Sequence, residues 1–332
     1  MRLAPLAALA LLATATPFVM ARAQTEPPKL AFPLACRIGV SCEIQHYVDR
    51  DAGPGTLDYR CGHRTNDAHD GTDVRLLDMA AQRAGVDVLA AAAGRVVAVR
   101  DGVQDISIRA PGAPSTAGHQ CGNRVAIQLG GGWLIDYCHL AQGSLKVKVG
   151  DVVAAGQPLA HVGLSGDTEF PHLHFSVRHA DKVVDPFASG SAAGCAAPEE
   201  GAPLWLPAVA AQMPYRRGLV LNAGFSAAPV AMAAVEERAA PAPLATAPAL
   251  VAYARLIGLE MGDAIEMTLA GPNGTSLAAA TAPPLEHNMA QFLAEVRGAA
   301  PRGGWPHGVY VAELRVHRGG AVAITRRWRT TL

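Results

Sequence analysis

The sequence has no excess of charge of either sign and no long internal apolar run. Lys+Arg and Asp+Glu are both 28, so the formal net charge is zero, and only four of the basic residues are lysines. A nucleic-acid partner would need a basic excess or a basic stripe to meet its phosphates, so none is expected. Beyond the first residues no uncharged apolar run reaches about 18 residues, which excludes a stable membrane span in the mature chain.

The sequence also has no His-Glu-x-x-His motif, which excludes the helical metalloprotease site in which a glutamate is the base. What it does have is length and apolar content. With 332 residues, 50% of them hydrophobic, the chain is long enough for two domains with cores of their own.

The first residues, MRLAPLAALALLATATPFVMARAQ, have the pattern of a secretory signal peptide. One early arginine precedes an apolar stretch, and Ala21-Arg22-Ala23 makes a small-x-small cleavage site. We therefore expect residues 1–23 to be a signal peptide and the mature chain to begin at Gln24. The alternative is a membrane anchor, which the short apolar run and the lack of a stop-transfer pattern disfavour.

Six cysteines in an exported chain favour disulfides over thiolate metal ligands. Cys121 and Cys138 bracket two alternating strands around Gly130-Gly131-Gly132. A two-residue turn there would set position 138 opposite about 123, within reach of Cys121, so we predict a Cys121–Cys138 bond. Since six cysteines allow many connectivities, the other pairs are guesses: Cys42 with Cys61 and Cys36 with Cys195.

Turn formers and alternating runs divide the rest of the chain and predict an all-β fold. Residues 24–60 are rich in turn formers and could pack on the next domain or cover its cleft. Residues 61–190 hold many short strands between glycine-rich turns, and an Ala/Pro/Gly-rich linker follows over 191–209. Residues 210–332 alternate again, which fits a C-terminal β-sandwich of the immunoglobulin or fibronectin type, an accessory domain without clustered exposed aromatics.

The stretch TEFPHLHFSV, residues 168–177, places two histidines around a leucine just after a proline. Side chains alternate faces along a strand, so His172, His174 and Ser176 share one face while the apolar residues share the other. Two imidazoles at this spacing lie roughly 6–7 Å apart. That distance suits one metal ligand and one neighbour of the ligand, although surface histidines with no function would show the same pattern.

Other polar side chains extend this pattern toward a metal site. AHDGTDV places His69 and Asp73 four residues apart, and DYCHLAQ places His139 at the end of an alternating strand. A catalytic zinc ion takes three protein ligands with N, O or S donors and one water. His69, Asp73 and one histidine of the His172/His174 pair would supply such a set.

These motifs together resemble the lysostaphin-type, or LytM-type, peptidoglycan zinc endopeptidases. The resemblance rests on His-x-Gly-x-Asp, Tyr-x-His-Leu, and Gly-x-x-Gly followed by Pro-His-Leu-His-Phe, and it covers residues 61–187. It implies an antiparallel β metallopeptidase domain over 61–190 with one Zn²⁺ per chain. TEF stands where the family has a small residue before Pro-His-x-His, which would alter the cleft wall. Carried over position by position, the resemblance implies zinc ligands at His69, Asp73 and His174 and catalytic, non-ligand histidines at His139 and His172.

A bound cation would lower the pKa of a water toward about 7 and polarise the scissile carbonyl, leaving proton transfer and oxyanion binding to His139 and His172. Other candidates near the motifs have less support. Asp70 is expected to point into solvent, Glu169 to be a solvated loop residue, and His161 to have a core or supporting role.

The resemblance implies hydrolysis of peptide bonds in peptidoglycan stems or cross-links. Export, neutral charge and the lack of a wall-anchor motif favour the periplasm of a Gram-negative bacterium, with secretion as the alternative. The rival hypothesis is a LytM-like module that activates another wall hydrolase without catalysis. All three ligand positions and both catalytic histidines are present, which favours the enzyme. The C-terminal domain could bind wall polymer, a wall hydrolase or a scaffold protein.

Overall fold

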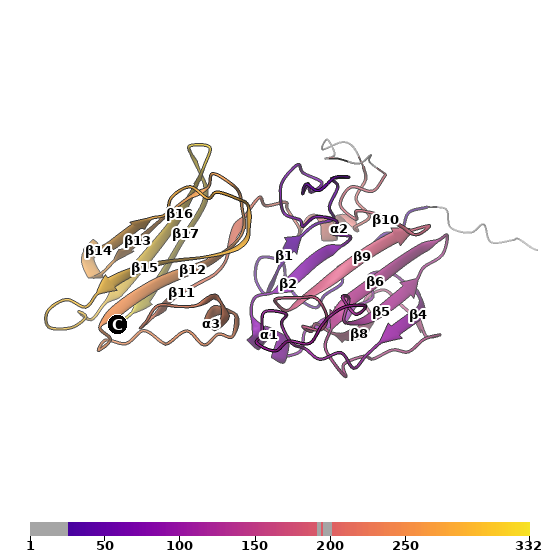
Figure 1. The fold of residues 1–332 in the computed structure, drawn as a ribbon, viewed down its shortest axis with the longest axis horizontal. Helices are drawn as coiled ribbons and strands as arrows, with labels where there is room; N and C mark the ends of the chain where they lie inside the picture. Colours follow the sequence, from indigo (N-terminus) through magenta and orange to yellow (C-terminus); the bar gives the residue numbers. More distant parts are fainter. Residues whose placement is uncertain (1–25, 191–193, 195–200) are drawn as a thin grey trace, which may run out of the picture.

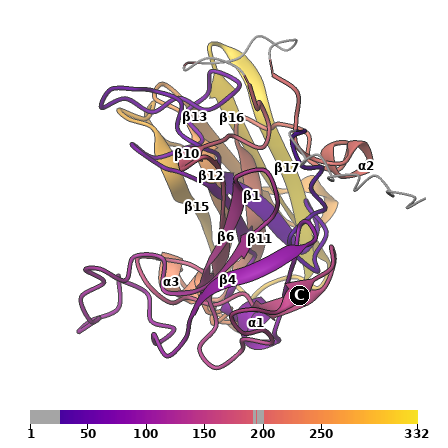
Figure 2. The ribbon, with the colours of Figure 1, turned by 90° about the vertical axis from the view of Figure 1, so that its right-hand side faces the viewer.

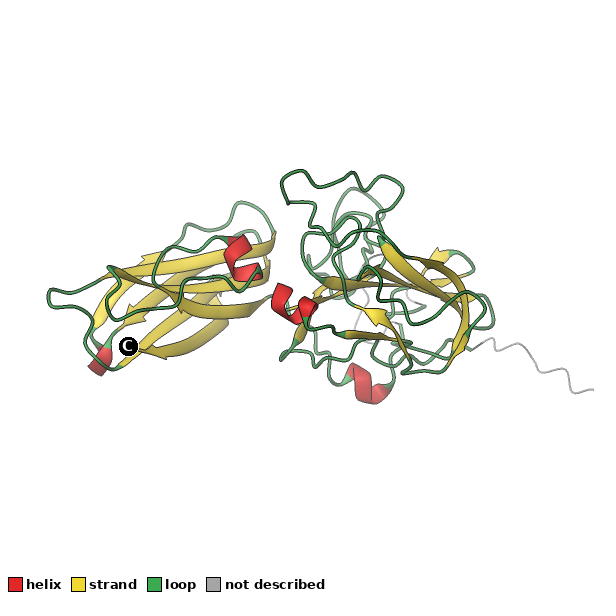
Figure 3. Ribbon diagram, turned by 90° about the horizontal axis from the view of Figure 1, so that it is seen from below, coloured by secondary structure: helices red, strands yellow, loops and turns green. Residues whose placement is uncertain are grey.

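The computed structural model describes residues 26–190, 194 and 201–332. The signal peptide over 1–23, Cys195 and residues 191–193 and 195–200 of the predicted linker lie outside this range. The described chain is mostly β-structure in two parts that lie side by side (Figures 1 and 3). The few helices are short: α1 (Met79–Arg83), α2 (Pro207–Ala210), α3 (Met232–Glu236) and the 3₁₀ turn Pro272–Gly274. No helix among the described residues is long and apolar enough to cross a membrane.

The first part is built on an antiparallel sheet in the order β1-β2-β9-β6-β5-β4-β7, with β10 added to β9. Alternating apolar residues such as Leu173, Phe175 and Val177 turn to its buried face, as the period of two requires. A small second sheet pairs β3 (Asp87–Leu89) with β8 (Pro158–His161). The main strands are β1 (Cys42–His46), β2 (Thr72–Leu76), β4 (Gly94–Arg100), β5 (Asn123–Gln128), β6 (Trp133–Leu140), β7 (Val152–Val153), β9 (His172–His179) and β10 (Lys182–Val183).

The segment before residue 61 belongs to this sheet. Its strand β1 pairs antiparallel with β2, and Leu30, Ile44 and Tyr47 are buried in the core of the first part. Burial of three such side chains contributes several kcal/mol, at about 1.5–3 kcal/mol for each. The segment therefore stabilises the sheet and forms one side of it.

The hairpin of β5 and β6 carries the predicted Cys121–Cys138 disulfide, which is confirmed. Its register differs from the expectation, because a bulge and a longer loop set Asn123 opposite Leu140 rather than position 138. The other guesses are wrong, since Cys42 bonds to Cys36 six residues away. The tight turn from Cys36 to Cys42 brings these two Cα atoms within 6.0 Å, which leaves neither cysteine for a more distant partner.

The second part contains two further antiparallel sheets, β11-β12-β15 and β14-β13-β16-β17. Alternate residues of both sheets, among them Leu256, Met267, Val296 and Leu314, meet in one apolar core. Turning the molecule by 90° brings the sheet of the first part in front of these strands (Figure 2). The strands are β11 (Leu219–Ser226), β12 (Ala249–Leu259), β13 (Ala264–Ala270), β14 (Ser276–Thr281), β15 (Met289–Ala299), β16 (Val309–Arg318) and β17 (Ala321–Thr331).

Candidate metal centre

Strand register brings the predicted site residues together on one face of the main sheet. Asp73 of β2 lies opposite His174 of β9, and His174 lies opposite Cys138 of β6. Residues paired across an antiparallel ladder share a face, as do residues two apart on a strand. His172 therefore joins His174 on the face of Asp73, as the spacing predicted.

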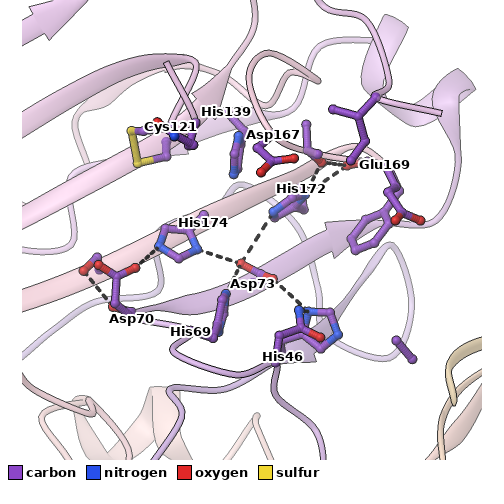
Figure 4. A pocket seen from close by; sticks show the side chains of 18 of the residues that line it. His46, His69, Asp70, Asp73, Cys121, His139, Asp167, Glu169, His172 and His174 are labelled. Carbon is purple, nitrogen blue, oxygen red and sulfur yellow. Dashed lines mark hydrogen bonds and ion pairs between the residues drawn. A yellow bond between two sulfur atoms is a disulfide. The ribbon is translucent and has the colours of Figure 1, made fainter. Parts of the chain in front are cut away.

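His69, Asp73 and His174 form a close cluster on this face (Figure 4). Their candidate ligand atoms all lie within 4.8 Å of one another. Asp73 Oδ1 is 3.1 Å from His69 Nε2 and 3.0 Å from His174 Nδ1. Gly71 lets the chain pass this close, because a Cβ there would lie 2.6 Å from the His174 ring. Two imidazole nitrogens and a carboxylate oxygen are a donor set that zinc takes.

In both histidines of the cluster, the ring nitrogen that does not face Asp73 Oδ1 has a hydrogen-bond partner within the protein. His69 Nδ1 is 2.7 Å from the Tyr47 carbonyl, which can only accept, so Nδ1 donates to it and Nε2 is the nitrogen left for a metal ion beside Asp73. His174 Nε2 is 3.1 Å from Asp70 Oδ1. The expectation that Asp70 points into solvent is wrong, since its other oxygen is bound by Arg178. Such outer partners orient the ligands of metal sites.

His46 is a member of the site that the sequence analysis missed. It ends β1 opposite Asp73, and its Nδ1 is 2.9 Å from Asp73 Oδ2. This contact occupies the carboxylate oxygen that faces away from His69 and His174, and so fixes the orientation of Asp73. No local motif marks His46, because 27 residues separate it from its partner and only strand pairing joins them.

His139 reaches the same face by a break in strand geometry. Its neighbour Cys138 lies opposite His174, so regular alternation would turn His139 to the other face of the sheet. His139 instead has a φ of +58°, a left-handed conformation that is uncommon for non-glycine residues. The turned ring lies 4.6 Å from the His172 ring, centroid to centroid.

Both His139 and His172 are neutral bases held by backbone carbonyls. His139 Nδ1 donates to the Ser165 carbonyl at 2.7 Å, and His172 Nδ1 donates to the Phe170 carbonyl at 2.9 Å. Each Nε2 therefore carries a free lone pair. Burial lowers the pKa of His172 to about 4 and moves the pKa of His139 well below its usual range.

His174 is the charged histidine of the cluster in the absence of a metal ion. Burial by itself lowers its pKa, but hydrogen bonds to the Asp70 and Asp73 carboxylates raise it to about 9. At neutral pH its ring then carries protons on both nitrogens. Ligation through Nδ1 requires one of them to leave.

Zinc binding at pH 7 is therefore expected to release about one proton per ion, and the zinc affinity is expected to rise up to about tenfold per pH unit between pH 7 and 9. The sign follows from the metal-binding form, which is the deprotonated one. Calorimetric titration in buffers of different ionisation enthalpy measures the released proton. Asp70→Asn removes one of the two carboxylates that raise the pKa of His174, so this variant should release less. Proton-neutral zinc binding by the wild type would contradict the assignment of His174.

A cleft of about 900 Å³ opens over this face and is lined by all six site residues named above, including His46. The TEF segment forms part of its wall: Thr168 Oγ1 is 3.0 Å from His172 Nδ1, and the Phe170 ring centroid lies 4.9 Å from that of His172. Glu169 also lines the cleft and is paired with Arg109 at 2.6 Å. His161 lies elsewhere, 3.2 Å from Asp87.

Comparison with known proteins identifies a family domain in the first part of the chain. The model of Peptidase family M23 matches residues 68–186, which include His69, Asp73, His139, His172 and His174 but not His46. A curated relative, the cell division protein DipM of Caulobacter vibrioides, is 38% identical over 79 residues. That match covers 23% of this chain and 13% of DipM, so this chain spans only a small part of that protein.

Two solved structures are similar to part of the chain. A zinc-containing peptidase from Vibrio cholerae is 25% identical with a TM-score of 0.28, over 42% of this chain and 38% of that one. The catalytic domain of the antimicrobial peptidase lysostaphin from Staphylococcus simulans is 22% identical, also with a TM-score of 0.28, over 43% of this chain and 86% of that one.

Proposed function

Because residues 68–186 form a domain of peptidase family M23, we propose that this chain is a zinc-dependent endopeptidase that hydrolyses peptide bonds of peptidoglycan stems or cross-links. One Zn²⁺ would be held by His69 Nε2, Asp73 Oδ1 and His174 Nδ1. One observation carries the proposal: three donor atoms and two further imidazole lone pairs converge in one cleft, with the far nitrogens of the histidines already hydrogen-bonded.

A zinc ion held by these three residues would supply Lewis acidity toward the scissile carbonyl and a bound water. The chain's own residues do the rest. His139 and His172 stay neutral at working pH because burial lowers their pKa values, so each Nε2 can accept the proton of an attacking water. The imidazolium formed can donate a hydrogen bond to the developing oxyanion or pass the proton to the leaving amine. The Ser165 and Phe170 carbonyls hold both rings in the required tautomer.

We further propose that the protein acts outside the cytoplasm, in the periplasm of a Gram-negative bacterium. Disulfides persist in oxidising compartments, and Cys36–Cys42 and Cys121–Cys138 are both formed. A peptidoglycan substrate is found in the same place. The signal peptide predicted over residues 1–23 would direct export.

The test is the zinc content of the purified mature protein together with digestion of purified murein. We expect one zinc ion per chain and release of muropeptides, with release abolished by a chelator and restored by added zinc. A zinc-loaded protein that releases nothing would overturn the enzyme and leave the activator of another wall hydrolase as the better hypothesis. Removing the segment before residue 61 would not test whether this segment covers the cleft, since β1 and His46 would be lost with it.

A further inference from the structure

We propose that the start of strand β15, Met289–Gln291, is a substrate-binding wall of the cleft, so that the C-terminal part helps to select the peptide. This inference rests on the proposed function. The cleft is lined on one side by loop residues of the first part, such as Ile108 and Phe170, and also by Met289, Ala290 and Gln291 of the second part. The start of β15 therefore lines the same cleft as the cluster of His69, Asp73 and His174.

The C-terminal part contacts the face of the main sheet that bears the site, through Arg75. Arg75 lies two residues beyond Asp73 on β2 and opposite His172 on β9, so it shares their face. Its side chain is fully buried, with its guanidinium 4.2 Å from the centroid of the Phe170 ring. Phe170 in turn contacts His172. Arg75 therefore packs against a residue that lies next to a proposed catalytic group.

Arg75 also binds the C-terminal part. Its Nη1 donates to Gln291 Oε1 at 2.8 Å and its Nη2 to Glu236 at 3.0 Å. Glu236 accepts from Arg255 as well, and Arg255 reaches back to the Leu77 carbonyl in the first part. Buried charged groups of this kind tolerate little displacement, because an unpaired charge there is strongly unfavourable. The network holds β15 in a fixed position beside the site.

A second contact fixes the backbone of the wall. Gln45 is buried, donates from Nε2 to the Ala290 carbonyl at 2.8 Å, and accepts from Arg75 at its Oε1. The Ala290 carbonyl is thus already bonded within the protein. A substrate would therefore meet this wall through side-chain contacts with the partly buried Met289 and the exposed Ala290, rather than through pairing with the strand. The wall suits the apolar part of a peptide chain.

The experiment measures binding and turnover of a purified cross-linked muropeptide by the full-length zinc-loaded protein. Met289→Ala should raise the KM at least about fivefold, and Ala290→Trp, which adds a bulky ring at the cleft wall, about tenfold or more. The matched controls are Met261→Ala, at a methionine that is 69% exposed and outside the cleft, and Ala279→Trp, at an exposed alanine of β14. Both controls should keep the KM of the wild type. Zinc content and melting temperature are measured for every variant.

The dissociation constant of the same muropeptide is also measured in a His172→Ala background, where cleavage is not expected. Weaker binding by both wall variants at unchanged zinc content supports the wall. Equal KM and equal affinity in the wall variants and their controls would overturn it while leaving the enzyme intact. A wild type that neither cleaves nor binds the muropeptide would overturn the proposed function first and the wall with it. A wild type that binds without cleaving still tests the wall through the dissociation constant.

Discussion

Replacing His172 by alanine is expected to lower murein hydrolysis by at least about 10³-fold while the protein still holds one zinc ion. His172 Nε2 is 3.5 Å from Asp73 Oδ1, farther than the nitrogens of His69 and His174, which are 3.1 and 3.0 Å from the same oxygen. This position fits the role of a base beside the three donors, which is the role that we propose for His172. The loss should appear in kcat with the metal content unchanged.

Zinc content by elemental analysis and muropeptide release by chromatography check this expectation. His161→Ala is the matched control, because His161 is a histidine of the same part that lies outside the cleft and contacts Asp87. It should retain full activity. If His172→Ala loses its zinc, His172 is a ligand, and the division of the histidine pair into one ligand and one base is wrong. His139→Ala should repeat the result of His172→Ala.

The cluster could be predicted from sequence because its parts lie in short motifs with strand periodicity. The spacing of two between His172 and His174 fixes a common face, and the β2–β9 register then sets Asp73 opposite His174. The division into ligands and bases came from the resemblance to a family and stays a proposal. His139 shows where periodicity alone fails, since only its left-handed backbone brings it to the site.

The residues that were missed are joined to the site by long-range packing. His46 meets Asp73 only because β1 pairs with β2, and Arg75 meets Gln291 across 216 residues. No local pattern records such contacts. The prediction for Asp70 is wrong for a related reason: its side-chain partners are His174 and Arg178, which lie more than a hundred residues away in the sequence. The cysteine guesses failed because a tight turn joined Cys36 to Cys42.

The division of the chain into domains at about 61, 190 and 210 stays a prediction, as does the immunoglobulin or fibronectin type of the C-terminal sheets. The contacts between the two parts nonetheless have a physical consequence. Arg75 and Arg255 are both buried and share Glu236, so the face between the parts carries charges that cannot be exposed one at a time without cost. The ion pairs of Arg75 and Arg255 with Glu236 therefore keep the C-terminal part beside the cleft.

Zinc affinity should fall strongly in Asp73→Ala and less in His46→Ala. Asp73→Ala removes a donor and the charge that faces His69 and His174, so we expect zinc affinity to fall more than about 100-fold. His46→Ala leaves all three donors in place but frees Asp73 Oδ2, so we expect a loss of about 10- to 100-fold. Competition with a chromogenic chelator gives both values.

The same pair of variants separates a metal site from a polar cluster with only a structural role. An ion that binds the native state alone stabilises it by about 2.7 kcal/mol at a free concentration one hundred times its Kd. Zinc should therefore raise the melting temperature of the wild type, raise that of His46→Ala only at higher zinc concentration, and leave Asp73→Ala unmoved. Equal melting shifts in all three proteins would place the zinc elsewhere. His46 hydrogen-bonds Asp73 and lies edge-on to the His69 ring, with the ring centroids 5.7 Å apart, so the intermediate behaviour of His46→Ala would report the orientation of these two donors.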